Sequence, residues 1–219
     1  MPVVRPGVDT SVILDATARV IAERGIEGVR MGAVAERAGV AKGVLYLRFT
    51  DKHDLLRAVV DREFVLATRH AADLVAADPG GGAFSRLYVH SLSALHARPA
   101  LLRLYRDPAT ALRALATDAD TDRVRRRTLI GADFLRTLQD TGIVTGDLDA
   151  DVLAENLTLW SLALAARAPH GDVDALILGM GDLVARAVDT DIADTTPGKR
   201  AFSAMAEALI EERERSCTP

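Results

Sequence analysis

The sequence predicts an all-α protein in which a small three-helix head precedes a larger helical domain. Hydrophobic residues make up 49% of the 219 and aromatic residues only 4%. Alanine and leucine, both good helix formers, supply much of the apolar content. Apolar residues recur at helical spacing between glycine and proline breaks, and no segment alternates apolar and polar residues over a strand length. The length allows a small domain joined to a larger one.

The first helix is expected to run to about Arg24. Asp9, Thr10 and Ser11 precede its apolar positions, and each can cap a helix N-terminus through a side-chain oxygen. Gly25 stands where this helix ends, as glycine commonly does after the last helical residue. The head therefore begins with a helix that has a clear start and stop.

Residues 31–49, MGAVAERAGVAKGVLYLRF, indicate two short helices joined by a tight turn. Gly39 lies where the chain must turn sharply, in a conformation that is costly for a residue with a Cβ. The second helix runs from about Ala41 to Phe49, and Leu45 and Phe49 are expected to pack inward. Such a helix can lie in a DNA major groove, with base edges and phosphates within reach.

The larger domain is expected to be helical throughout. A fourth helix starts near Asp51, whose carboxylate suits a helix N-terminus, and continues to the Asp-Pro-Gly-Gly-Gly break at 78–82. Further helices are expected over these stretches: 83–97, a short one from Pro99, another from Pro108, 118–141, 152–167, 173–188 and a last one from about Pro197. The stretch 118–141 is predicted to be one long helix.

From Val12 to Val60 the chain closely resembles the N-terminal domain of the TetR family of bacterial transcriptional regulators. The matching motifs stand in the family's order: the first helix ILDATARVIAERG, the AxxAGV turn at 35–40, KGVLYLRF at 42–49 and TDKHDLL at 50–56. One such motif alone is weak evidence because alanine-rich helix pairs are common. Four motifs in the right order and spacing make the resemblance strong over about the first 60 residues.

The sequence departs from the family pattern at three positions. Met31 replaces a Ser or Thr that usually caps the second helix, Ala41 replaces a frequent Ser, and Arg48 replaces a common Tyr or His. The first two changes remove hydroxyl groups, and the third exchanges an aromatic side chain for a cation. The resemblance implies a helix-turn-helix DNA-binding domain over residues 1–58 and a helical effector-binding and dimerisation domain over residues 59–219.

The predicted DNA contacts lie on and beside the second helix of the motif. They are Ala41, Lys42, Gly43, Val44, Tyr46, Arg48 and Lys52. The three cations are expected to meet phosphates, or a guanine edge in the case of Lys42. Val44 can contact a thymine methyl group, and the Tyr46 hydroxyl a phosphate. Gly43 is unfavourable inside a helix, so it indicates close approach either to DNA or to the first helix.

The charge distribution agrees with this placement. The formal net charge is −4 at pH 7, which by itself argues against a nucleic-acid-binding protein. Residues 1–60 hold nine Lys and Arg against seven Asp and Glu, a net +2, so the rest of the chain, with 18 against 24, carries −6. The basic surplus therefore lies in the segment that holds the motif.

The larger domain offers candidates for an effector pocket and a subunit interface. Its bulky side chains can line a small-molecule cavity or simply form a core: Leu101, Leu104, Tyr105, Phe134, Leu138 and Trp160. The helices at 152–167 and 173–188 are apolar on more than one face, so they need burial. We expect them to form a four-helix bundle in a homodimer, and the alternative is that they are domain core. The interface candidates are Leu159, Leu162, Leu176, Met180 and Leu183.

Several kinds of site are not expected. The sequence shows no catalytic constellation and no metal-ligand spacing, and its single cysteine, Cys217, cannot form a disulfide within one chain. We therefore expect neither an enzyme nor a cofactor or metal. The N-terminus lacks an apolar stretch of signal-peptide length, and no segment reaches the ~20 apolar residues that span a bilayer. A cytoplasmic location without membrane contact is expected.

The resemblance implies a ligand-responsive repressor that binds a palindromic double-stranded DNA operator as a homodimer and is released by a small molecule. The bulky apolar candidates favour an apolar or amphipathic effector. An activator or a ligand-independent regulator of the same fold also fits the sequence. A helical enzyme or ligand carrier with a DNA-binding-like head is the alternative from a different class of protein.

Overall fold

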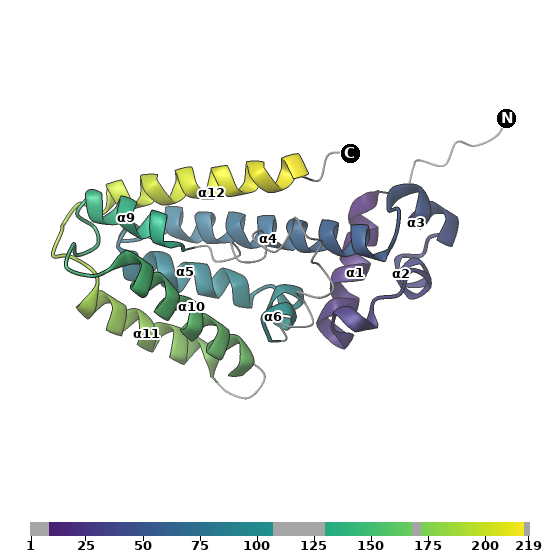
Figure 1. Ribbon diagram of the computed structural model, residues 1–219, viewed down its shortest axis with the longest axis horizontal. Coiled ribbons are helices and arrows are strands. Elements are labelled where there is room, and N and C mark those ends of the chain that lie inside the picture. Colours follow the sequence, from purple (N-terminus) through teal and green to yellow (C-terminus); the bar gives the residue numbers. More distant parts are fainter. Residues whose placement is uncertain (1–8, 107–129, 168–171, 217–219) are drawn as a thin grey trace.

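The computed structural model describes residues 9–106, 130–167 and 172–216 (Figure 1). Over these ranges the regular elements are helices, and the β pairing is an isolated antiparallel bridge between Val144 and Asp189. The predicted all-α class is confirmed. The elements are α1 (Thr10–Arg24), the 3-10 turn η1 (Ile26–Gly28), α2 (Met31–Ala38), α3 (Lys42–Arg48), α4 (Lys52–Ala77), α5 (Phe84–His96), α6 (Pro99–Arg106), α9 (Ala132–Asp140), α10 (Ala150–Arg167), α11 (Val173–Ala187) and α12 (Thr196–Ser216).

The molecule has a head at one end and a layered helical body behind it (Figure 1). α1, α2 and α3 form the head, and α4 runs from the head along the whole body. In the body α4 packs between α12 and α5, and α5 packs against α11 on its other side. α6 lies at the junction, where it packs against α1 of the head and against α10 of the body.

The head helices begin and end where local chemistry directs them. The Asp9 carboxylate caps α1 by accepting a hydrogen bond from the Ser11 backbone N–H, and Asp51 caps α4 by accepting from Asp54. Gly25 ends α1 at φ +70°, and Gly39 ends α2 in the left-handed region at φ +67°. Both glycines adopt backbone conformations that a side chain disfavours, so the sharp turn predicted at Gly39 is confirmed.

Two clusters of buried apolar residues divide the molecule. The first joins α1, α2 and α3 to the N-terminal half of α4 and to α6, and the second fills the body. Along α4, Val60 and Ala67 belong to the first cluster, while Ala71 and Val75 belong to the second. α4 is therefore shared by both cores, and the packing itself draws no line at residue 58.

One helix differs from its prediction. Residues 118–141 were expected to form a single helix, but Ile130 and Gly131 are not helical and α9 begins only at Ala132. Gly131 is the N-cap of α9, in an extended conformation that glycine adopts easily. Three other parts of the chain lie outside the described residues: positions 118–129 of that stretch, the start of the helix predicted from Pro108, and Cys217.

Candidate DNA-binding head and effector cavity

The second helix of the motif, α3, is anchored by residues whose burial agrees with the sequence prediction. Leu45 is fully buried and Phe49, just after the helix, is almost so, and both belong to the head core. Ala41 is the N-cap of α3 and makes no side-chain hydrogen bond there, as expected for a residue without a hydroxyl. The N-cap of α2 is Arg30, and Met31 is buried as the first residue of that helix.

Most of the predicted DNA contacts face solvent. The exposed ones are Ala41, Lys42, Gly43, Tyr46 and Arg48, while Val44 and Lys52 are half-buried. The ammonium of Lys42 lies 5.9 Å from the ring centroid of Tyr46, one helical turn along. A Cβ built on Gly43 meets no atom within 4 Å, so packing against the described chain does not require a glycine there.

The cations of the head fall into two groups. Arg37 forms an ion pair with Glu23 at 2.6 Å, and Arg62 forms one with Asp15 at 2.6 Å, so both help to hold the head together. Lys42 and Arg48 form no ion pair within the described part of the chain. Their positive charge is therefore available to a polyanion, as phosphate contacts require.

Sequence reasoning missed one prominent residue of α3. Leu47 is 85% exposed, more than any other large apolar side chain in the described ranges. The signal was present, because Leu47 is two residues beyond the buried Leu45 and two residues turn a helix by about 200°. Leu47 therefore lies on the outward side of α3, together with Gly43.

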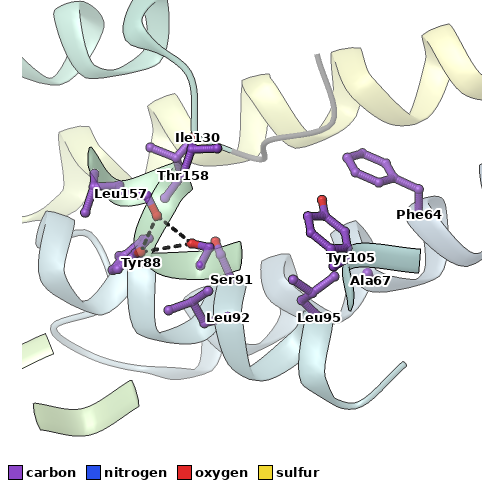
Figure 2. Close-up of a pocket in the computed structure, with 11 residues that line it drawn as sticks. Phe64, Ala67, Tyr88, Ser91, Leu92, Leu95, Tyr105, Ile130, Leu157 and Thr158 are labelled. Atoms are coloured by element: carbon purple, nitrogen blue, oxygen red, sulfur yellow. Dashed lines mark hydrogen bonds between the residues drawn. The ribbon is translucent and has the colours of Figure 1, made fainter. Parts of the chain in front are cut away.

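A cavity opens between α4, α5, α6 and α10 (Figure 2). Its lining consists of Phe64, Ala67, Tyr88, Ser91, Leu92, Leu95, Tyr105, Ile130, Leu157, Thr158 and Ser161. The cavity volume is about 50 Å³, room for roughly two to four water molecules. The described lining residues include no Asp, Glu, Lys, Arg or His, so this part of the wall carries no fixed charge.

Four of the hydroxyl groups in the lining, those of Tyr88, Ser91, Thr158 and Ser161, donate to backbone carbonyl oxygens. Tyr88 Oη donates to the Leu157 carbonyl oxygen at 2.9 Å and lies 3.0 Å from Ser161 Oγ, which itself donates to Leu157 at 2.7 Å (Figure 2). Ser91 and Thr158 likewise donate to carbonyl oxygens four residues earlier in their own helices. These oxygens keep lone pairs but have committed their hydrogens, so they can accept hydrogen bonds from a ligand.

Burial keeps this wall neutral. It raises the pKa of Tyr88 to about 12, although the hydrogen bond with Ser161 acts in the opposite direction. Tyr88 therefore keeps its proton at any physiological pH. An uncharged, mainly apolar molecule with a hydrogen-bond donor fits this chemistry, whereas a bare carboxylate would find no cation among the described lining residues.

The six residues predicted to line a pocket lie in three places. Tyr105 lines the cavity. Leu101 and Leu104 are buried in the head core, because α6 packs against α1. Phe134 and Leu138 are buried in the body core, and the half-buried Trp160 packs against Tyr88 with ring centroids 6.1 Å apart. Sequence reasoning missed the remaining lining residues.

A buried ion pair adjoins the cavity on the α12 side. Arg213 of α12 donates to Asp61 of α4 at 2.7 Å, and their side chains are 6% and 5% exposed. The Arg213 guanidinium also lies over the ring of Phe64, 4.9 Å from its centroid. Since Phe64 lines the cavity, one ring contacts both the cavity and the ion pair that joins α12 to α4.

Three consecutive residues of α4 form ion pairs with three different parts of the chain. Asp61 pairs with α12, Arg62 pairs with Asp15 of α1, and Glu63 accepts two hydrogen bonds from Arg98 at 2.9 and 2.7 Å. Arg98 lies in the turn between α5 and α6. We call residues 61–63 the α4 joint. It directly precedes Phe64, so it lies on α4 between the cavity lining and the N-terminal part of the helix that packs on the head.

The interface candidates lie on or beside an uncovered face of α10 and α11. Leu159 is 60% exposed, Leu183 is 62% exposed and Leu176 is also exposed, while Leu162 and Met180 are half-buried. On α10, Val152, Ala163 and Ala166 share the outward side with Leu159. An apolar face of this kind on two adjacent helices is characteristic of an interaction surface.

No helix among the described residues is long and apolar enough to cross a membrane. The same part of the chain brings together no group of His, Cys, Asp and Glu side chains that could hold a metal ion.

Comparison with known proteins gives consistent similarities. A sequence profile described as "Bacterial regulatory proteins, tetR family" matches residues 13–59. The chain is 35% identical to the HTH-type transcriptional repressor KstR of Mycolicibacterium smegmatis over 171 residues, which is 74% of this chain and 79% of the relative. It is 31% identical to KstR of Rhodococcus jostii, over 68% of this chain and 70% of the relative.

Solved structures show the same fold. The transcriptional regulator FadR from Bacillus subtilis, in complex with stearoyl-CoA, superposes with a TM-score of 0.64 over 80% of this chain and 97% of that one, at 19% identity. The ketosteroid transcriptional regulator KstR2 of Mycobacterium tuberculosis superposes with a TM-score of 0.59, at 19% identity, over 82% of this chain and 96% of that one.

Proposed function

Because the chain belongs to the TetR family of bacterial regulatory proteins and is a ligand-responsive transcriptional repressor, we propose that it binds a palindromic operator as a homodimer and is released by an apolar or amphipathic small molecule. The observation that carries the DNA-binding part is the outward face of α3. There, Lys42 and Arg48 are exposed and form no ion pair in the described chain. In a dimer, two such helices would enter successive major grooves ~34–36 Å apart.

The homodimer is proposed to form through α10 and α11. Leu159 and Leu183 are exposed on adjacent helices, and covering them with the same surface of a second copy would bury them in a four-helix bundle. This arrangement fixes the distance between the two heads, which the operator then matches. A regulator of this design acts on chromosomal DNA in the cytoplasm.

The effector is proposed to enter the cavity between α4, α5, α6 and α10. The cavity is narrow, so a molecule larger than a few waters has to move its walls apart, and Phe64 and Ala67 of α4 are part of those walls. The B. subtilis structure indicates that this fold can take up a molecule with a long acyl chain. Displacement of α4 would then reach the head through the α4 joint, with a coupling free energy of ~1–3 kcal/mol.

The DNA-binding proposal is tested by selecting duplexes from a random pool and titrating them by fluorescence anisotropy. We expect an inverted repeat and an affinity that falls steeply with salt concentration, because phosphate contacts release counterions. Lys42→Ala should weaken binding severalfold, whereas Arg200→Ala, which removes an exposed cation from α12 in the body, should not. Equal effects of the two substitutions would remove α3 as the binding surface.

The effector proposal is tested by screening compounds for release of the selected operator. Uncharged apolar compounds and amphiphiles are expected to release it, and small hydrophilic metabolites are not. Ala67→Leu, which fills the cavity, should keep operator binding and lose the response, while Ala76→Leu on an exposed position of the same helix should keep both. Release that is unchanged in Ala67→Leu would place the effector elsewhere.

A further inference from the structure

α3 presents an apolar line to solvent between two polar edges. Leu45 is fully buried, and the helical rotation places Gly43 and Leu47 on the opposite side of the helix. Lys42 and Tyr46 flank this line on one edge, with the lysine over the tyrosine ring. Val44 and Arg48 flank it on the other. The part of α3 that projects furthest from the head is therefore apolar, while its two cations stand to either side.

Neither residue of the apolar line is explained by packing within the described chain. Leu47 is 85% exposed, so it contributes almost nothing to the head core. A Cβ on Gly43 would have open space around it, and glycine lowers helix stability compared with alanine. A partner that lies directly against this line would account for both residues, because it would cover the leucine and use the missing side chain for close approach.

We propose that Leu47 is a specificity-determining residue that contacts the C5-methyl group of a thymine in the major groove, with Gly43 allowing α3 to approach closely. This inference rests on the proposed DNA-binding function. A leucine side chain has no hydrogen-bond donor or acceptor, and among the base edges of the major groove the thymine methyl is the apolar group. The flanking cations fit such a contact, since Lys42 and Arg48 would reach the phosphates on either side of the groove while Leu47 reaches the base edges on its floor.

The test removes the methyl group alone. In operator duplexes selected by the protein, each thymine is replaced in turn by deoxyuridine, which keeps the base pair and all its hydrogen-bonding groups. At one thymine position in each half-site, the change to deoxyuridine should lower the affinity of the wild-type protein for the duplex about fourfold per half-site. Leu47→Ala should weaken binding to the thymine duplex by a similar factor, and deoxyuridine at that position should then cause no further loss.

The matched control is Val12→Ala, which shortens another exposed apolar side chain of the head, on α1. This variant should keep the wild-type affinity and the full deoxyuridine effect. Circular dichroism should show unchanged melting for Leu47→Ala, because an exposed side chain supports little of the fold.

Two results would overturn the inference. One is a wild-type protein that binds its duplex equally well with deoxyuridine at every thymine. The other is a Leu47→Ala variant that keeps the full deoxyuridine effect at every position where the wild type shows one. Both presuppose operator binding, so they are distinct from failure of the proposed function, in which the wild-type protein would select no duplex at all.

Discussion

The head and the body leave different kinds of side chain uncovered. On the head, Lys42 and Arg48 face solvent without an ion pair in the described chain, whereas Arg37 is engaged with Glu23. On the body, exposed apolar side chains gather on α10 and α11, with Leu159 and Leu183 about 60% exposed, whereas the exposed Leu47 of the head lies between the two cations. Free cations match a polyanion, and an apolar helix face matches another apolar surface. The two regions are therefore built for different partners.

The interiors differ as well. The buried residues of the head form one cluster that continues onto α6, so α1 to α3 pack as one core with the N-terminal half of α4. The body contains a cavity with neutral walls, next to a buried ion pair between Asp61 and Arg213. The difference supports our proposal that the body responds to the effector and the head reads the DNA.

The largest effect is expected from charges placed on the uncovered body face. The double variant Leu159→Glu with Leu183→Glu would bury unpaired carboxylates in the proposed dimer, at a cost of several kcal/mol, and should sediment as a monomer. Val12→Glu, on the exposed surface of α1, should leave the dimer intact. A dimer that persists in the double variant would remove α10 and α11 as the interface.

Breaking the ion pair beside the cavity should have the next largest effect. Arg213→Met leaves the Asp61 carboxylate buried without its cation, which should lower the free energy of unfolding by ~3–5 kcal/mol. The double variant Asp61→Leu with Arg213→Met removes both charges and should regain most of that loss. Urea unfolding measures all three proteins, and a double variant as unstable as the single one would contradict a specific pairing.

A moderate effect is expected at the start of α4. Lys52→Ala should weaken binding to operator and to random DNA alike, and it should reduce the slope of log affinity against log salt by about 1, as loss of a phosphate contact does. Arg200→Ala supplies the control in the body. If Lys52→Ala weakened only operator binding, its role would be base readout instead.

The smallest effect concerns pH and belongs to the body. Arg86, and then His90, hold the pKa of Asp78 well below its usual value of 3.8 through hydrogen bonds at 2.6 and 2.8 Å. The pKa of Asp78 is lower in the folded than in the unfolded protein. Its charge therefore stabilises the fold fully at a pH above the unfolded-state pKa, and this stabilisation is lost as the pH falls toward the folded-state pKa. Asp78→Asn should therefore be less stable than the wild type at pH 6, and the difference should shrink toward pH 3. A difference that does not change with pH would assign the effect to shape and not to charge.

The head was predictable because its determinants are local. Gly39 takes the left-handed turn, and Leu45 and Phe49 pack inward, because each depends on neighbours a few residues away. The cavity depends on how distant helices dock. Leu101 and Leu104 looked suitable for a cavity wall but face α1, since α6 packs against the head.

Residue size explains another part of the difference. Bulky side chains such as Phe134 and Leu138 fill the space around them and become core. The cavity occurs where small side chains, including Ala67, Ser91 and Ser161, leave space beside larger ones. A search for large apolar residues therefore selects core positions, and small residues at helix crossings are recognisable only once the crossings are known.

The most direct test of the account measures operator affinity against half-site spacing. Two heads on one dimer require their half-sites on the same side of the duplex, about one helical turn or a multiple apart. Inserting about five base pairs, half a turn, should reduce affinity to that of a single half-site. Inserting a full turn should not restore it, because heads at a fixed distance cannot reach half-sites that lie ~34–36 Å further apart. An affinity that is unchanged by the half-turn insertion would contradict a dimer with two fixed DNA-binding heads.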